Sequence, residues 1–184
     1  MTPKPLDLFS LAGKITAITG GGGELCGAMA IALGAMGVKV AILDKHLDNA
    51  KKREDTITAS GGTAMAMACD VLDSAQLQEC ASKIAKAWGP VNFLVNGAGG
   101  NDPRGTTSQD FFDVKTMDDQ GVTTIFDLDS DGYRQVFDLN FLGTFLTTQV
   151  FSKGMIQQSA GAIVNISSMS ADVPLTKVAA YSAA

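Results

Sequence analysis

The stretch from residue 14 to residue 44, "KITAITGGGGELCGAMAIALGAMGVKVAILD", decides the fold. Its first six residues, 14–19, form an apolar, β-branched run that breaks into glycines, as a buried parallel strand does where it ends. Residues 24–36 then place apolar side chains at helical spacing, and Gly37 is a natural helix stop. Residues 38–44 read as a second strand. The stretch therefore predicts a strand–helix–strand unit with a glycine-rich turn after its first strand.

The same alternation of strands and helices continues along the chain. The further elements expected are a helix at 47–60, a strand at 63–70, a helix at 73–88, a strand at 91–100, helical periodicity from 133 onward, a strand at 161–168 and a helix from about 179. Such alternation is typical of an α/β fold with a parallel sheet and right-handed crossovers. We expect one Rossmann-like, doubly wound domain over residues 1–184, with five strands present.

One segment breaks this rhythm. Residues 101–130 are polar, rich in aspartate and long for a connection inside a compact domain. Loops of that length are usually functional lids or disordered segments. We therefore expect an insertion or lid loop at about residues 100–130.

Composition narrows the class of protein. The net charge of −5 argues against a nucleic-acid or anionic-membrane surface. Cys26, Cys69 and Cys80 have no metal-like spacing and are expected to be reduced thiols, and a single histidine, His46, leaves little for a metal cluster. The N-terminal residues 1–14 lack the apolar core of a signal peptide, and no segment is apolar over membrane-spanning length. We expect a cytoplasmic protein without a metal.

The glycine cluster "TGGGGELCG" (19–27) joins the first strand to the first helix. Glycines at that place let the backbone approach a pyrophosphate, and the helix N-terminus supplies free amides; a plain turn is the alternative. Asp44 ends the second strand, where a carboxylate can accept the ribose hydroxyls of NAD and repel the extra phosphate of NADP. It could instead cap the next helix, and Lys45 and His46 could weaken a preference for NAD.

Taken together with four later motifs, these residues resemble the short-chain dehydrogenase/reductase family. "TGGGGELC" stands where the family has Thr-Gly-x-x-x-Gly-x-Gly, with Glu24 and Cys26 in place of the second and third glycines. "CDV" (69–71), "NGAG" (96–99) and "DLNFLGTF" (138–145) match three further family motifs, although Gly97 replaces the usual second asparagine. The fourth is a serine followed by a tyrosine thirteen residues later, at the family's catalytic spacing.

The resemblance implies NAD(H) as cofactor and assigns roles to individual residues. Cofactor contacts are implied for Gly20, Gly22, Gly23, Leu25, Asp44, Asp70, Val71, Asn96, Gly97 and Ala98. Catalytic roles are implied for Asn140, which in the family holds a water, for Ser168, which would steady the substrate oxygen, and for Tyr181, the proton donor. Ser167 is the structural neighbour of the serine, and Asn140 could instead be a core asparagine with satisfied hydrogen bonds.

A smaller subgroup of the family is also suggested. "GGNDPRGTT" (99–107), "FFD" (111–113) and "FDLDSDGYRQVFDLNFLGTFLTTQVF" (126–151) look like the D-mannonate oxidoreductases, also called fructuronate reductases. That resemblance implies interconversion of D-fructuronate and D-mannonate and a homotetramer. Asn101, Arg104 and Ser168 are then candidate substrate contacts, although Arg104 could simply offset Asp102. Another polyol or keto-gluconate substrate is the alternative.

The sequence ends "YSAA", one residue before the position, 185, of the lysine that follows the tyrosine in the family. In the family that lysine lowers the tyrosine pKa from its ordinary value of about 10. Lys177 precedes Tyr181 by four residues but is expected in a loop and solvated. We expect an enzyme whose C-terminal part is missing, with a non-catalytic dinucleotide-binding fragment as the alternative.

Overall fold

The computed structural model describes residues 9–184. Most of the N-terminal segment 1–14, for which no signal peptide was expected, therefore lies outside the described residues. Five parallel strands form one sheet in the order β3-β2-β1-β4-β5. The strands are β1 (Ile15–Thr19), β2 (Lys39–Asp44), β3 (Thr63–Ala68), β4 (Phe93–Asn96) and β5 (Ala162–Asn165). The helices are α1 (Glu24–Ala35), α2 (Leu47–Ala59), α3 (Ser74–Trp88), α4 (Ser130–Phe137), α5 (Gly143–Gln157) and α6 (Ala179–Ala183). The predicted α/β, doubly wound fold is confirmed.

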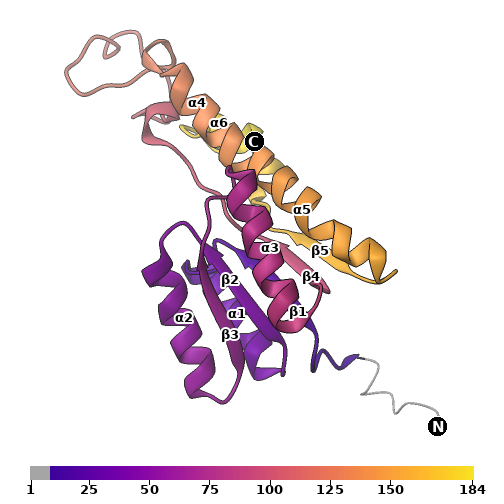
Figure 1. The fold of residues 1–184 in the computed structure, drawn as a ribbon. Helices are drawn as coiled ribbons and strands as arrows, with labels where there is room; N and C mark the ends of the chain where they lie inside the picture. The colour runs from indigo at the N-terminus through magenta and orange to yellow at the C-terminus, as the bar shows by residue number, and fades with distance from the viewer. Residues whose placement is uncertain (1–8) are drawn as a thin grey trace.

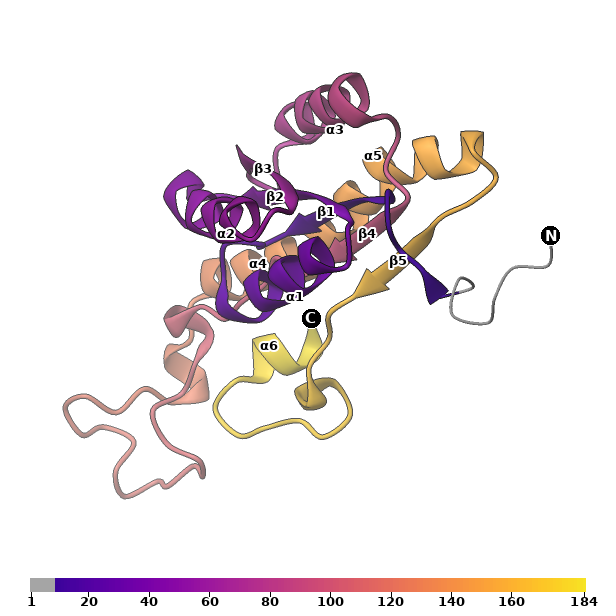
Figure 2. The ribbon, with the colours of Figure 1, turned by 90° about the horizontal axis from the view of Figure 1, so that it is seen from below.

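Helices cover both faces of the sheet (Figures 1 and 2). Successive residues of a strand point to opposite faces, so β1 supplies Ala17 to one core and Ile18 to the other. The first core lies under α3 and α5, with Leu77 and Phe151 buried in it. The second lies under α1 and α2, with Ile57 buried in it. Near-continuous apolar strands such as β2 are therefore explained by burial from both sides.

The helical region after the insertion is not the plain helix that the periodicity from residue 133 onward suggested. Val136 is buried, but Phe137 and Phe141 are 41% and 69% exposed. A π-helical turn, η4 (Asp138–Leu142), separates α4 from α5 and contains Phe141. A π-turn holds an extra residue, which shifts the face that each later side chain occupies.

The insertion projects from the body of the molecule beside α4 (Figures 1 and 2). It contains only two short 3-10 turns, η2 (Pro103–Gly105) and η3 (Ile125–Asp127), joined by turns and bends. A third 3-10 turn, η5 (Met169–Ala171), follows β5. Over residues 9–184, no helix combines the length and apolar character that a membrane crossing requires.

Candidate active site

The strand order reverses between β1 and β4, because β2 and β3 extend the sheet on one side of β1 and β4 and β5 on the other. Loops leaving the carboxyl ends of β1 and β4 therefore diverge and leave a crevice, which is where open α/β sheets bind ligands. Two clefts lie at this edge, one of about 680 Å³ and one of about 260 Å³. Ala98 and Gly99 line both, so the two clefts meet at the loop after β4.

The glycine-rich turn brings backbone close to backbone at this point. Gly20 has a φ of +62°, and a Cβ there would lie 2.9 Å from the Gly97 carbonyl oxygen. Only glycine fits both conditions. No side chain caps the first turn of α1, so its amides are free to bind an anionic group.

Two departures from the family's motifs, Cys26 in place of a glycine and Gly97 in place of an asparagine, compensate one another. A Cβ on Gly97 would lie 2.1 Å from the Cys26 sulfur, so the thiol occupies the space that a side chain at position 97 would need. Cys26 is buried. The Thr19 hydroxyl accepts hydrogen bonds from the amides of Gly97 and Ala98 at 3.1 and 3.2 Å, which holds the loop after β4 against the glycine-rich turn.

Glu24, the other residue that stands in place of a family glycine, is paired with Arg53. The Arg53 guanidinium, on α2, donates to the Gly22 carbonyl oxygen at 3.3 Å and to the Glu24 carboxylate at 2.7 Å. Gly27 packs directly against this side chain, since a Cβ there would lie 2.4 Å from Arg53 Nε. Glu24 itself is almost fully exposed at the start of α1. Arg53 thus offsets the negative charge that Glu24 adds beside the glycine-rich turn.

The smaller cleft is acidic at its base. Asp44, Asp70 and Val71 line it together with Gly20, as the sequence predicted for the cofactor side. Asp44 accepts hydrogen bonds from the amides of Gly22 at 3.0 Å and His46 at 2.9 Å. His46 is the N-cap of α2 and Asp44 precedes it, so the alternative role of Asp44 as N-cap of that helix is wrong.

Asp70 is fixed at the same cleft. Its carboxylate accepts from the Leu72 amide at 3.0 Å and pairs with the Lys45 ammonium at 3.0 Å. The pKa of Asp70 is lowered below its ordinary value, chiefly by the hydrogen bond from the Leu72 amide and then by Lys45. Partial burial acts in the opposite direction. The carboxylate is therefore ionised well into the acid range.

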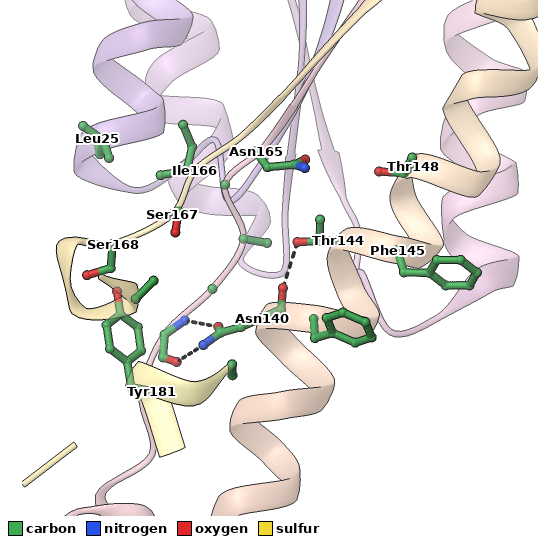
Figure 3. A pocket seen from close by; sticks show the side chains of 17 residues that line it. Leu25, Asn140, Thr144, Phe145, Thr148, Asn165, Ile166, Ser167, Ser168 and Tyr181 are labelled. Carbon is green, nitrogen blue, oxygen red and sulfur yellow. Dashed lines mark hydrogen bonds between the residues drawn. The ribbon is translucent and has the colours of Figure 1, made fainter. Parts of the chain in front are cut away.

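The larger cleft gathers the predicted catalytic residues (Figure 3). Asn140, Ser168 and Tyr181 all line it, and so does Leu25 from the first turn of α1. The Tyr181 ring, on α6, directs its hydroxyl toward Ser168, which follows β5 (Figure 3). Ser168 Oγ accepts from the Ser170 amide at 3.1 Å and so caps η5.

Asn140 holds the loop after β4 from the opposite side. Its side-chain oxygen accepts from the Gly100 amide at 2.8 Å, and its side-chain nitrogen donates to the Gly100 carbonyl at 3.0 Å (Figure 3). The Asn140 carbonyl accepts from the Thr144 hydroxyl at 2.9 Å. The amide is thus satisfied by a loop at the cleft, and it lies in the π-helical turn, a feature often found at functional sites.

Other predicted contacts lie outside both clefts. Asn96 is buried and donates to Thr148 Oγ1 and Asn165 Oδ1, both at 2.9 Å, so it ties β4 to α5 and β5. Arg104 is engaged by Asp102 through two hydrogen bonds of 3.1 and 2.7 Å and by Asp129 at 3.6 Å. Asn101 donates to Thr106 Oγ1 at 2.9 Å. Substrate roles for Asn101 and Arg104 stay predictions.

Lys177 lies in a loop, as predicted, but it is not simply solvated. Its ammonium lies 3.5 Å from Asp110 of the insertion, and its backbone has a φ of +69°. The sequence did not single out Thr144, Thr148 and Asn165, which also line the larger cleft. For the two threonines the signal was their four-residue spacing from Asn140 along one helical face. Within residues 9–184, no group of three or more His, Cys, Asp or Glu side chains is arranged to hold a metal ion.

Comparison with known proteins identifies the family. The model of the short chain dehydrogenases matches residues 14–184, which is nearly the whole chain. The chain belongs to the short-chain dehydrogenase family.

Several relatives cover most of this chain. An uncharacterized oxidoreductase, UxuB, from Bacillus subtilis is 47% identical over 95% of this chain and 62% of its own length. D-threitol dehydrogenase from Mycolicibacterium smegmatis is 30% identical over 95% of this chain and 60% of its own. A crystal structure of a proposed D-mannonate oxidoreductase from Haemophilus influenza, with bound NAD, superposes with a TM-score of 0.91 at 41% identity, over 95% of this chain and 61% of that one. The chain thus spans about three fifths of the length of these relatives.

Proposed function

We propose that the protein is an NAD(H)-dependent oxidoreductase that interconverts a sugar-acid carbonyl and alcohol, with D-fructuronate and D-mannonate as the pair. The observation that carries the proposal is the meeting of Ser168 and Tyr181 in a cleft that adjoins the glycine-rich turn (Figure 3). In this proposal the described residues are the first part of a single dinucleotide-binding domain, from which the insertion projects beside α4.

The residues present fit a dinucleotide. Glycines with no room for a Cβ bring Gly20 and Gly97 together, and the uncapped start of α1 offers amides to a pyrophosphate. Asp44 would accept the ribose hydroxyls, while Asp70 and Val71 would bound the adenine. Leu25, Gly97 and Ala98 line the larger cleft, where the nicotinamide would lie. When bound, NADH supplies the hydride.

The chain's own residues supply the polar part of the chemistry. The Ser168 hydroxyl would donate a hydrogen bond to the substrate oxygen and steady the negative charge that develops on it during reduction. Tyr181 would give its phenolic proton to that oxygen, and in the oxidation it would take the proton back. Asn140 would keep the loop after β4 in place through Gly100. Phe141 and Phe145 line the same cleft and give it an apolar side.

The sugar-acid substrate rests on similarity to the NAD-bound structure named above as a proposed D-mannonate oxidoreductase. A second candidate, a simple polyol, is favoured by the similarity to D-threitol dehydrogenase and, at 27% identity with a TM-score of 0.79, to a xylitol dehydrogenase structure with bound NAD+. A panel of D-fructuronate, D-mannonate, D-threitol and xylitol, each assayed with NADH or NAD+, separates the two candidates. We also propose a homotetramer, which light scattering on the full-length protein tests.

Tyr181→Phe tests the mechanism in the full-length enzyme. Removal of one hydroxyl should lower kcat by about 10²–10⁴-fold, the usual contribution of a general acid. The Kd for NADH should stay within about threefold, because the ring remains. Tyr133→Phe is the matched control, since Tyr133 is the chain's other tyrosine and lies on α4 outside the cleft lining. A Tyr181→Phe enzyme at full rate would refute the catalytic assignment.

Asp44→Asn tests the cofactor assignment. Asparagine keeps one acceptor for the amides of Gly22 and His46 but loses the negative charge, so the preference for NADH over NADPH should fall. Isothermal titration with each cofactor measures the ratio of the two Kd values. A parent protein that already prefers NADPH would show that Asp44 does not discriminate.

A further inference from the structure

Among the described residues that line the smaller cleft, Lys45 is the only lysine or arginine, and His46 lies beside it. It follows Asp44 directly in the chain, yet its ammonium lies 3.0 Å from Asp70 Oδ2. The lysine side chain is 70% exposed and Asp70 only 29%. The flexible partner in this pair is therefore the lysine, and the carboxylate determines where its charge rests.

Asp70 is held by more than the lysine. The Leu72 amide donates to its other carboxylate oxygen at 3.0 Å, and its own amide donates to Gln76 Oε1 at 2.9 Å. Gln76 is fixed in turn, because its side-chain nitrogen donates to Asp73 Oδ2 at 2.9 Å. Asp70 is thus a fixed, ionised anchor at the start of the segment after β3.

Asp44 is occupied differently. Both of its carboxylate oxygens accept backbone amides, from Gly22 and His46, while Lys45 is paired with Asp70. The acidic side chain at the expected ribose position thus keeps its negative charge without a salt bridge to its neighbour in the chain. An additional phosphate on that ribose would meet a carboxylate there, while the lysine next to it in the chain is drawn to another anion.

We propose that Asp70 is a specificity-determining residue for the cofactor, because it holds Lys45 away from the ribose and so prevents the lysine from offsetting the 2′-phosphate of NADPH. This inference rests on the proposed function, in which the smaller cleft holds the adenosine of NAD(H). Release of Lys45 requires only the loss of an exposed ion pair, which is a weak interaction. The freed ammonium, on a flexible side chain next to Asp44 in the chain, can then pair with the phosphate.

The test is the ratio of the Kd values for NADPH and NADH, measured by isothermal titration on the full-length protein. Asp70→Asn also removes a contact from the adenine side, but that loss affects both cofactors equally and cancels in the ratio. We expect Asp70→Asn to shift the ratio toward NADPH by about fivefold, the upper range for one exposed ion pair. In Asp70→Asn/Lys45→Met the relative affinity for NADPH should fall back to the parent's level or below it. Asp48→Asn, in the first turn of α2, is the matched control for the loss of one negative charge.

The double variant separates the lysine from simple charge. If Asp70→Asn shifts the ratio equally with and without Lys45, the carboxylate repels the phosphate directly and the inference is wrong. No shift in Asp70→Asn would also overturn it, while the proposed function would stand as long as the parent binds NADH. A parent that binds neither cofactor would refute the proposed function, and the inference with it.

Discussion

At the scale of single residues, the contact between Cys26 and Gly97 joins two positions that lie far apart in the sequence. The thiol fills the space above Gly97, and a Cβ at that glycine would lie 2.1 Å from the sulfur and 3.1 Å from the Thr19 carbonyl oxygen. Gly97 and Leu25, the residue before Cys26, line the larger cleft. A larger residue at position 97 should therefore be tolerated only with a smaller one at position 26.

Gly97→Ala should lower the free energy of unfolding by about 1–3 kcal/mol, the usual cost of overpacking. It should also weaken NADH binding, because the displaced backbone belongs to the cleft. Addition of Cys26→Ala should restore most of both losses, since the sulfur is then absent, while the Thr19 oxygen keeps the repair incomplete. Denaturant unfolding and NADH titration measure the two effects.

Gly100→Ala is the matched control for this pair. Its Cβ would meet only Leu139 at 3.9 Å, an ordinary contact, and the position has no positive φ. We expect it to change stability little. Equal losses in Gly97→Ala with and without Cys26→Ala would show that the two positions are independent.

Asp70 gives a prediction on pH. Its pKa is lowered in the folded state, chiefly by the Leu72 amide and then by Lys45, so its stabilisation is complete above the ordinary carboxyl pKa of about 3.9. The stabilisation is lost as pH falls through the lower, folded pKa. The difference in free energy of unfolding between the parent and Asp70→Asn should be up to about 1 kcal/mol at pH 6 and should shrink below pH 4. A difference that grows in acid would contradict the sign of this shift.

At the scale of elements, the insertion is attached to the segment that leads into α6. The Thr107 amide donates to the Lys177 carbonyl at 3.1 Å, and the Thr176 hydroxyl donates to Asp110 Oδ1 at 2.9 Å. Asp110 also pairs with the Lys177 ammonium. Because Tyr181 follows on α6, these contacts couple the position of the insertion to that of the tyrosine.

Asp110→Ala should therefore lower kcat severalfold and leave the Kd for NADH unchanged. The left-handed backbone at Lys177 costs free energy, on the order of 1–3 kcal/mol, and persists only where neighbours hold it. Steady-state kinetics of the full-length enzyme with cofactor titration separates the two quantities. Asp113→Ala, in the same loop but bonded only to the Lys115 amide, is the control. A variant with full kcat would show that the insertion does not position Tyr181.

The elements differ in how far the sequence determines them. The β-branched runs of β1 and β2 and the glycine turn between them are local features, and their prediction was confirmed within two residues. β3, made of alanine, methionine and threonine, has little strand propensity of its own and forms because β2 offers it a paired edge. The π-helical turn at Asp138–Leu142 has no recognisable local signal, so the exposure of Phe141 within it could not be predicted.

The same limit applies to the site. Ser168 and Tyr181 were predicted from the resemblance to the family, and both line the larger cleft. The burial of Asn96 between β4, β5 and α5 depends on tertiary neighbours, Thr148 and Asn165, that no local pattern reveals. Glu24 and Cys26 stand where the family's pattern has glycines. The partners that compensate them, Arg53 and Gly97, lie on other elements.

At the scale of the whole molecule, the order β3-β2-β1-β4-β5 divides the candidate site between two parts of the sheet. The smaller cleft takes its acidic residues from the ends of β2 and β3, and the larger cleft takes Ser168 and Tyr181 from the segment after β5. A dinucleotide that lies across both would contact each part and lose those contacts on unfolding. Cofactor binding should therefore stabilise the fold as a unit.

NADH at 100 times its Kd should raise the free energy of unfolding by about 2.7 kcal/mol, provided that the unfolded chain does not bind it. Scanning calorimetry of the full-length protein should show the unfolding temperature rising by several degrees, with NADPH giving less at the same concentration because of Asp44. Asp44→Asn should narrow the gap between the two cofactors, since the charge that opposes the second phosphate is gone. AMP, which would fill only the smaller cleft, should stabilise less than NADH at the same concentration, because it would contact one part of the sheet alone and so have the higher Kd. Equal shifts from AMP and NADH at the same concentration would show that the larger cleft contributes nothing to cofactor binding, and the division of the site between the two parts would then be wrong.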